Sequence, residues 1–338
     1  MADGALALPL VLSLGDPAGV GPELIAESWA RRREERLPPF LAVGGVRVLA
    51  EAARTRGLDL PMRAVSQASE AVALFDDALP VLGAEDGAFR PGAPDEQGAR
   101  LALASLEKAA ALAVEGRVAG IVTAPIAKSE LAKVGFAHPG QTEFVAAACG
   151  MAAEDAVMML AGPSLRTVPL TVHCALAEVP GRLSRALIER RCAIVARALA
   201  QDFGLAAPRL AICGLNPHAG EDGRMGREEI ETIAPAIAAL RASGIDATGP
   251  HPADSLFSPR ARETYDVAIA MYHDQALVPL KALDFDRGVN VTLGLPVVRT
   301  SPDHGTAFAI AGKGLADVGA TIAAIRMAGE MAARRARR

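Results

Sequence analysis

Short apolar runs alternate with longer stretches of helical periodicity along the chain. The apolar runs, which predict buried strands, cover residues 6–14, 40–44, 117–123, 156–160, 167–173, 209–213, 267–272 and 289–293. The helical stretches cover residues 22–29, 99–115, 181–200, 227–242 and 316–334. Strands that alternate with helices predict an α/β fold with a mostly parallel sheet, covered by helices on both faces. In such folds, ligands bind at the carboxyl ends of the strands.

The composition is that of an ordinary folded chain. Its 338 residues suffice for two domains or one large α/β domain, and 51% are hydrophobic against 22% charged. A net charge of -4 without a basic stripe argues against a nucleic-acid partner. No apolar run reaches the roughly 18 residues of a membrane span, so we expect no membrane association. The cysteines lack CxxC spacing and are expected to pack as small hydrophobes in a reducing cytoplasm; they are Cys149, Cys174, Cys192 and Cys213.

Three of the six histidines share one context, the end of a predicted strand. His173 and His273 each end an apolar run, and His218 follows the run at 209–213. Three imidazoles at strand ends can converge on a divalent metal and leave one coordination position open. A single histidine in such a setting is more often a hydrogen-bonded core residue, so both interpretations stay open. Asp254 and Asp274 are nearby candidates for a ligand, an orienting partner or a helix cap.

Two glycine-rich segments lack a nucleotide-binding fingerprint. Residues 15–21 join a strand to a helix without the spacing of a Rossmann or P-loop motif, and residues 303–314 form a second such segment. Lys281, Asn290 and Arg299 follow His273 on predicted loops, and their donors suit a phosphate or a carboxylate. Each of these three also fits an ordinary surface position.

Sequence motifs in order along the chain carry a family resemblance. LSLGDPAGVGPEL, GLNPHAGEDGRMGREE, MYHDQALVPLK and RTSPDHGTAFAIAGKG resemble the 4-hydroxythreonine-4-phosphate dehydrogenase family. The resemblance implies an isocitrate/isopropylmalate dehydrogenase-like fold, with two α/β/α domains and a cleft between them. We expect residues 1–130 with 275–338 to form the first domain, and residues 131–274 the second.

The resemblance also implies a site for each component of the reaction. A divalent metal (Zn, Mg or Co) is expected between the subunits of a homodimer, held by His173, His218 and His273. The phosphorylated substrate is expected at Gln141, Thr142, Lys281, Asn290 and Arg299. NAD or NADP is expected at His304, Gly305, Thr306 and Gly312. The residues with implied catalytic roles are Lys281, Asp254 and Lys128.

The implied reaction oxidises 4-phosphooxy-L-threonine to a β-keto acid that decarboxylates to 3-amino-2-oxopropyl phosphate, in pyridoxal phosphate biosynthesis. The group that accepts the alcohol proton stays open among Lys281, Lys128 and a metal-bound water. Gln141 and Ala127 replace the histidine and asparagine usual in the family. A related dehydrogenase acting on a four-carbon sugar-acid phosphate or a dihydrodiol carboxylate is therefore an alternative. A metal-dependent lyase or hydrolase, or a non-catalytic metal-binding protein, would not reduce a nicotinamide.

Overall fold

The computed structural model describes residues 7–337. Residue 338 and residues 1–6, which include the first residue of the first predicted strand and the start of the first predicted domain, lie outside this range. The chain divides into two compact units, Met1–Ala153 with Leu295–Arg338 (unit 1) and Glu154–Gly294 (unit 2). These boundaries differ from the expected ones. Residues 131–153 belong to unit 1, where α6 packs against α4, and residues 275–294 belong to unit 2, where α12 and β11 pack against β6.

Unit 1 is built on a fully parallel sheet. Its strands run in the order β3 (Met62–Val65), β4 (Leu79–Leu82), β2 (Phe40–Val43), β1 (Leu10–Ser13), β5 (Gly120–Thr123) and β12 (Arg299–Pro302). Its helices are α1 (Gly21–Ala30), α2 (Val46–Thr55), α3 (Glu70–Leu74), α4 (Glu96–Val114), α5 (Lys128–Lys133), α6 (Gln141–Ala148) and α13 (Gly319–Ala336), with a short 3-10 turn η1 (Ala153–Asp155) at the unit boundary.

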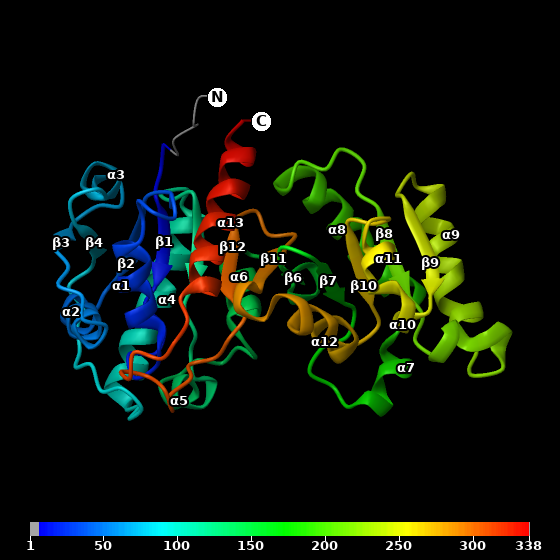
Figure 1. Ribbon diagram of the computed structural model, residues 1–338, viewed down its shortest axis with the longest axis horizontal. Helices are drawn as coiled ribbons and strands as arrows, with labels where there is room; N and C mark the ends of the chain where they lie inside the picture. Colours follow the sequence, from blue (N-terminus) through cyan, green and yellow to red (C-terminus); the bar gives the residue numbers. More distant parts are fainter. Residues whose placement is uncertain (1–6, 338) are drawn as a thin grey trace. The chain divides into compact units, whose positions relative to one another are not determined.

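Helices cover both faces of the unit 1 sheet (Figure 1). Val11 and Ile121 pack in one cluster with Leu112 of α4. Their neighbours Leu12 and Val122 line a small cavity with side chains from α1 and α13. Because adjacent strand residues point to opposite faces, α4 lies on one face and α1 with α13 on the other.

Unit 2 has a mixed sheet. Its strands run in the order β11 (Val289–Leu293), β6 (Val157–Ala161), β7 (Arg166–Pro169), β10 (Val267–Ala270), β8 (Leu210–Cys213) and β9 (Ala247–His251). The pairs β11–β6 and β6–β7 are antiparallel and the other pairs are parallel. The helices are α7 (Val179–Arg182), α8 (Arg185–Asp202), α9 (Ala234–Ala242), α10 (Ala253–Leu256), α11 (Pro259–Arg262) and α12 (His273–Asp284), with short turns η2 (Leu176–Glu178), η3 (Pro217–Gly223) and η5 (Phe285–Arg287) and a π-helical turn η4 (Glu229–Ile233).

Several predicted elements end earlier than the apolar pattern suggested. β7 ends at Pro169 and β10 at Ala270, so His173 lies in the following segment and His273 begins α12. The helix predicted from residue 181 is interrupted before α8, because the Ser184 hydroxyl accepts a hydrogen bond from the Leu187 amide and caps a new helix there. Lys281 and Arg299 were expected on loops but lie on α12 and β12. Asn290, also assigned to a loop, lies on β11, which matches the apolar run predicted at residues 289–293.

The cysteines are unpaired thiols among the described residues. Burial raises the pKa of Cys192 and Cys213 to about 12, which fits the expected role as small hydrophobes. Cys149 and Cys174 are only partly buried, so that role does not extend to them. No helix within residues 7–337 is long and apolar enough to cross a bilayer.

Candidate active site

Two of the three predicted metal ligands lie side by side in unit 2. The ring centroids of His173 and His273 are 6.0 Å apart. Two imidazoles that share one ion at about 2.1 Å per nitrogen have centroids on the order of 5 Å apart, so this spacing is close to that of a shared site. Both rings line a pocket of about 300 Å³, together with Cys174, Leu176 and Asp274.

The local sequence around His273 fixes its orientation. His273 Nδ1 lies 2.7 Å from Asp274 Oδ1, a contact that favours a proton on Nδ1 and leaves the lone pair of Nε2 available to a ligand. The neighbouring Gln275 is buried, accepts from the Met271 amide at 2.6 Å and donates to the Gly214 carbonyl at 2.9 Å. Gln275 therefore ties the end of β10 to the end of β8 and fixes the start of α12.

His218 occupies a strained turn. From His218 to Asp222, every residue of η3 has a positive φ, between 45° and 80°. Non-glycine residues adopt this left-handed conformation at an energetic cost, and such strain is typical of functional sites. Asp254, exposed in α10, belongs to an element that packs against η3.

The buried Glu229 holds the segment that carries His218. Its Oε1 accepts from the amides of Leu215 and Asn216 at 2.7 and 2.8 Å, and its Oε2 accepts from Asn216 Nδ2 at 3.0 Å. These bonds satisfy the backbone where β8 ends and the left-handed turn begins.

The donor set fits a divalent metal, but it is incomplete within one described chain. Imidazole nitrogens suit zinc and similar ions, and a carboxylate on the far ring nitrogen is the usual support. Within residues 7–337, however, no three His, Cys, Asp or Glu side chains converge as a metal-binding group. The structure brings His173 and His273 together and does not bring His218 to them.

The predicted substrate residues divide between the units. In unit 2, Lys281 lies on the same helix as His273, with its Nζ 5.9 Å from the Phe285 ring centroid. Asn290 on β11 has a buried Oδ1 that accepts no hydrogen bond from the described part of the chain. An orphaned buried acceptor of this kind fits a polar ligand.

In unit 1, Arg299 is the centre of a buried polar cluster. Its Nη2 donates to Thr123 Oγ1 at 2.7 Å and to Gln141 Oε1 at 3.1 Å, and its Nη1 donates to Thr142 Oγ1 at 3.3 Å. Burial lowers the pKa of Arg299 to about 10, with Glu143 opposing the shift, so the side chain is still a cation at neutral pH. The acceptor atoms of these three bonds are neutral hydroxyl and amide oxygens.

Gln141 and Lys128 adjoin this cluster. Besides accepting from Arg299, Gln141 donates through Nε2 to the Ala124 carbonyl at 3.0 Å, so the protein uses both ends of its amide. Lys128, the first residue of α5, is exposed and places its Nζ next to Gly140, the residue before Gln141.

The four predicted cofactor residues share one segment of unit 1, residues 303–318, between β12 and α13. This segment packs on the other glycine-rich segment: the Val20 amide donates to the Thr306 carbonyl at 3.0 Å, and a Cβ on Gly19 would meet that carbonyl at 2.8 Å. His304 Nε2 is buried and finds no hydrogen-bond partner in the described chain, whereas Gly305 faces open space. These features fit a polar ligand lying against the segment.

Comparison with known proteins identifies the family. The sequence matches the pyridoxal phosphate biosynthetic protein PdxA over residues 36–328. The chain belongs to the PdxA family. The resemblance inferred from the motifs and the α/β fold class are thereby confirmed.

Relatives of the PdxA family cover nearly the whole chain. One from Erythrobacter litoralis (strain HTCC2594), named 4-hydroxythreonine-4-phosphate dehydrogenase, is 62% identical and covers 97% of this chain and 98% of its own. A crystal structure of the enzyme of that name from Klebsiella pneumoniae has a TM-score of 0.84 at 38% identity, over 96% and 99% of the two chains. A terephthalate 1,2-cis-dihydrodiol dehydrogenase from Burkholderia xenovorans LB400 has a TM-score of 0.64 at 32% identity, over 96% and 98%.

Sequence reasoning missed Gln275, Glu229 and Thr123 as supports of this PdxA-family site. Gln275 is only two residues beyond His273, and Glu229 follows the GLNPHAGE motif, so their proximity to candidate ligands was an available signal. Thr123 ends an apolar strand, where a side chain reaches the ligand-binding edge of the sheet.

We expect Glu229→Gln to destabilise unit 2 by about 1–3 kcal/mol, because the new amide nitrogen would face the Asn216 donor that Oε2 now accepts. Urea unfolding of the two variants would measure this change. Glu231→Gln is the matched control, since Glu231 forms a surface ion pair with Arg227 and such pairs contribute at most about 1 kcal/mol. Equal stabilities for both variants would contradict the role of Glu229.

Proposed function

We propose that this PdxA-family protein is an NAD(P)-dependent, divalent-metal-assisted dehydrogenase of 4-phosphooxy-L-threonine. A bound nicotinamide would accept the hydride of the secondary alcohol while the alcohol proton is released. The resulting β-keto acid would lose CO2, and the carbon left behind would take up a proton to give 3-amino-2-oxopropyl phosphate. The observation that carries the proposal is 62% identity, over 97% of the chain, to a relative named for this activity.

The proposed metal site uses His173 and His273 of one chain. When bound, the ion supplies Lewis-acid stabilisation of the oxygen on the reacting carbon. Asp274 holds the His273 ring, and Gln275 fixes the helix start that presents it. His218 is the proposed third ligand. It lies on a turn that directly follows two backbone amides that donate to Glu229. The candidate ions are Zn, Mg and Co.

The proposed substrate contacts are cationic and amide groups. Arg299 is a cation that Thr123, Gln141 and Thr142 hold in place, and its guanidinium suits the phosphate or carboxylate of the substrate. Asn290 and Lys281 in unit 2 add a polar amide and a second cation. Lys281 and Lys128 are the proposed candidates for accepting the alcohol proton, and Asp254 for orienting a partner of the metal site. The dinucleotide is proposed to lie along residues 303–318.

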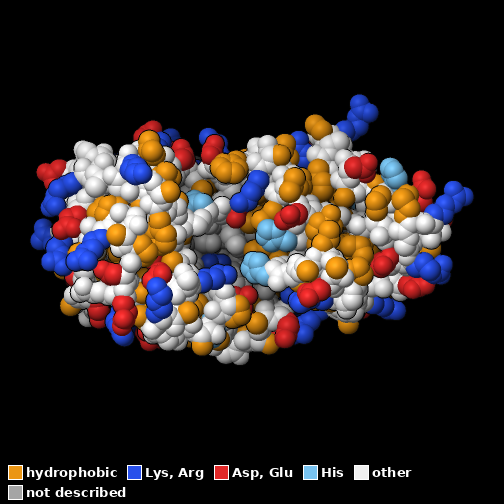
Figure 2. Space-filling view, turned by 90° about the horizontal axis from the view of Figure 1, so that it is seen from below, with side chains coloured by type: hydrophobic (Ala, Val, Ile, Leu, Met, Phe, Trp, Pro, Cys, Tyr) orange, Lys and Arg blue, Asp and Glu red, His pale blue; other side chains and the backbone are white. Residues whose placement is uncertain are grey.

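A homodimer is part of the proposal, because it would supply the ligand that one chain lacks. Exposed hydrophobic side chains support an interface at this face. Leu176, which lines the histidine pocket, is 65% exposed, and Val278 on α12 is 63% exposed. Figure 2 shows histidine side chains at the molecular surface with hydrophobic side chains beside them. Exposed apolar groups near a functional site are typical of an interaction surface.

A cytoplasmic location is also proposed, supported by the absence of a disulfide among residues 7–337.

The proposal is tested by assaying purified protein with the phosphorylated hydroxythreonine, each candidate metal, and NAD or NADP. Absorbance of the reduced cofactor should rise only when all components are present. Turnover without a nicotinamide would instead indicate a lyase or hydrolase. The Burkholderia relative makes a dihydrodiol carboxylate the appropriate competing substrate, and a higher kcat/KM for it would replace the proposed substrate.

Gln141 offers a test of the substrate site. We expect Gln141→Ala to raise the KM for the phosphorylated substrate about tenfold, because it removes one acceptor that positions Arg299. Gln141→His should retain more activity and add a pH dependence near the imidazole pKa of about 6.5. Steady-state kinetics between pH 5.5 and 8.5 would measure the KM change and the pH dependence, because this range extends at least about one unit to either side of that pKa. Unchanged constants in both variants would remove Gln141 from the site.

A further inference from the structure

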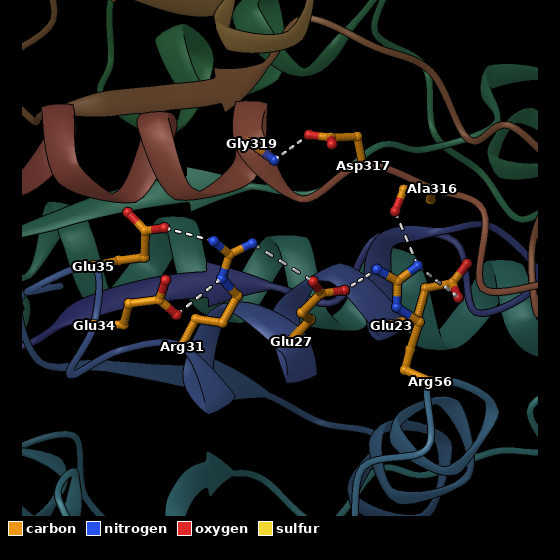
Figure 3. A network of polar contacts seen from close by, with 9 residues as sticks. All are labelled: Glu23, Glu27, Arg31, Glu34, Glu35, Arg56, Ala316, Asp317 and Gly319. Atoms are coloured by element: carbon orange, nitrogen blue, oxygen red, sulfur yellow. Dashed lines mark hydrogen bonds and ion pairs between the residues drawn. The ribbon is translucent and has the colours of Figure 1, made fainter.

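Residues 303–318 contain neither helix nor strand, so this segment depends on local turns and on contacts from other elements to hold it in place. Two side chains anchor the segment near its C-terminal end, and Figure 3 shows one of these contacts, between Arg56 and Ala316. Arg56 Nη1 donates to the Ala316 carbonyl at 2.9 Å, and Glu23 Oε1 accepts from the Gly312 amide at 3.3 Å. Arg56 follows α2 and Glu23 lies in the first turn of α1, so both anchors come from regular elements of unit 1.

The anchors form one buried ionic group. The side chain of Glu23 is fully buried, and its Oε2 lies 3.9 Å from Arg56 Nη1. Arg56 Nη2 also contacts Glu27 Oε2 one turn along α1. Burial raises the pKa of Glu23, and the Gly312 amide and Arg56 oppose this shift. A buried ion pair of this kind is seldom the most stabilising choice at a position, which indicates a role in specifying one conformation.

Close packing of Gly312 against Pro91 also restricts this end of the segment. Gly312 has a φ of +71°, and a Cβ at this position would lie 2.6 Å from Pro91 Cγ. The backbone of the segment therefore sits between Pro91 and the Glu23 carboxylate. A close fit on both sides leaves the segment little freedom to move while the anchors persist.

From these contacts we infer that Glu23 and Arg56 are positioning residues for the dinucleotide, which hold the 303–318 segment in its binding conformation before the cofactor arrives. The identity of the ligand rests on the proposed function, whereas the anchoring does not. A segment ordered in advance loses less conformational entropy on binding. Removal of the anchors should therefore weaken dinucleotide binding and leave the chemical step and the substrate site unchanged.

Arg56→Gln tests the inference, with Arg31→Gln as a matched control. Arg31 belongs to the same network through Glu27 but otherwise pairs with Glu34 and Glu35, away from the segment. In ligand-free protein, amide hydrogen exchange over residues 310–318 should be about tenfold faster in Arg56→Gln, because its local opening becomes easier, and should match the parent in Arg31→Gln.

Kinetics supply the second measurement. The KM and Kd for the dinucleotide should rise about tenfold in Arg56→Gln, while kcat and the KM for the phosphorylated substrate stay within about twofold of the parent. Arg56→Lys should recover part of the loss, since it keeps the positive charge that faces Glu23 and Glu27 as well as a donor for Ala316. Glu23→Gln, which keeps an acceptor for Gly312, gives a milder change in the same direction and serves if Arg56→Gln does not fold.

The outcomes separate the two levels of the hypothesis. Unchanged exchange over residues 310–318 in Arg56→Gln and Glu23→Gln overturns the anchoring, whatever the enzyme does. Faster exchange with an unchanged Kd for the dinucleotide overturns the positioning role. A parent protein that turns over without nicotinamide contradicts the proposed function but leaves the exchange result standing.

Discussion

Replacing His273 by alanine is expected to strip the metal and lower kcat/KM by at least about a thousandfold, since Lewis-acid stabilisation of the reacting oxygen is worth several kcal/mol. His273 should show this effect strongly because it has the most complete support: Asp274 at 2.7 Å on its far nitrogen, and a helix start fixed by Gln275. Metal content by mass spectrometry and turnover with the phosphorylated hydroxythreonine would measure both losses.

His251→Gln is the matched control for this substitution. His251 is another partly buried histidine of unit 2, but its ring contacts Thr248 Oγ1 at 2.9 Å in β9 and does not line the pocket of His173. It should keep full metal content. Asp274→Asn should fall between the two, with metal affinity reduced about 10- to 100-fold, as for other orienting carboxylates. Full metal occupancy in His273→Ala would refute the site.

The central strands could be predicted from the sequence because burial on both faces leaves a continuous apolar run. β1, β2, β5 and β8 are fully buried and all were anticipated. β3 has two exposed residues, and β9 contains Gly249 and Pro250. β12 reads Arg-Thr-Ser-Pro, and its polar side chains are buried by tertiary contacts that no local pattern reveals. These strands were therefore missed.

The site was predictable in its residue types and less so in its geometry. Imidazoles after apolar runs indicated the metal chemistry, and two of them do meet. The left-handed turn at His218 follows backbone amides that donate hydrogen bonds to Glu229, which lies eleven positions after His218. Arg299 was expected on a loop, but it is a buried strand residue whose acceptors described above come from two other places in the chain, β5 and α6. Long-range partners of this kind leave no trace in spacing or periodicity.

The structure also sharpens how a shared metal site would be built. His173 and His273 lie together on one chain, and no third ligand from residues 7–337 joins them. In a two-fold symmetric dimer, each subunit would then give this pair to one site and His218 to the other. This assignment of ligands to the two subunits predicts which pairs of inactive variants restore activity in a heterodimer.

Co-expressed His218→Ala and His273→Ala subunits, isolated as a heterodimer through two different affinity tags, should show about half of the parental kcat per dimer. One site of this heterodimer takes His173 and His273 from the first chain and His218 from the second, so it is intact. The other site lacks two ligands and should be inactive. Metal content should likewise be about one ion per heterodimer, against about two in the parent.

The matched control is a heterodimer of His173→Ala and His273→Ala subunits, in which each site lacks one member of the pair. His173 and His273 of one chain lie side by side and would serve the same site. Neither site of this heterodimer can therefore be completed, and activity should stay at the level of the single variants. Recovery in this control, rather than in the first heterodimer, would mean that the pair serves two different sites. Absence of recovery in both would remove His218 as the ligand contributed by the second subunit.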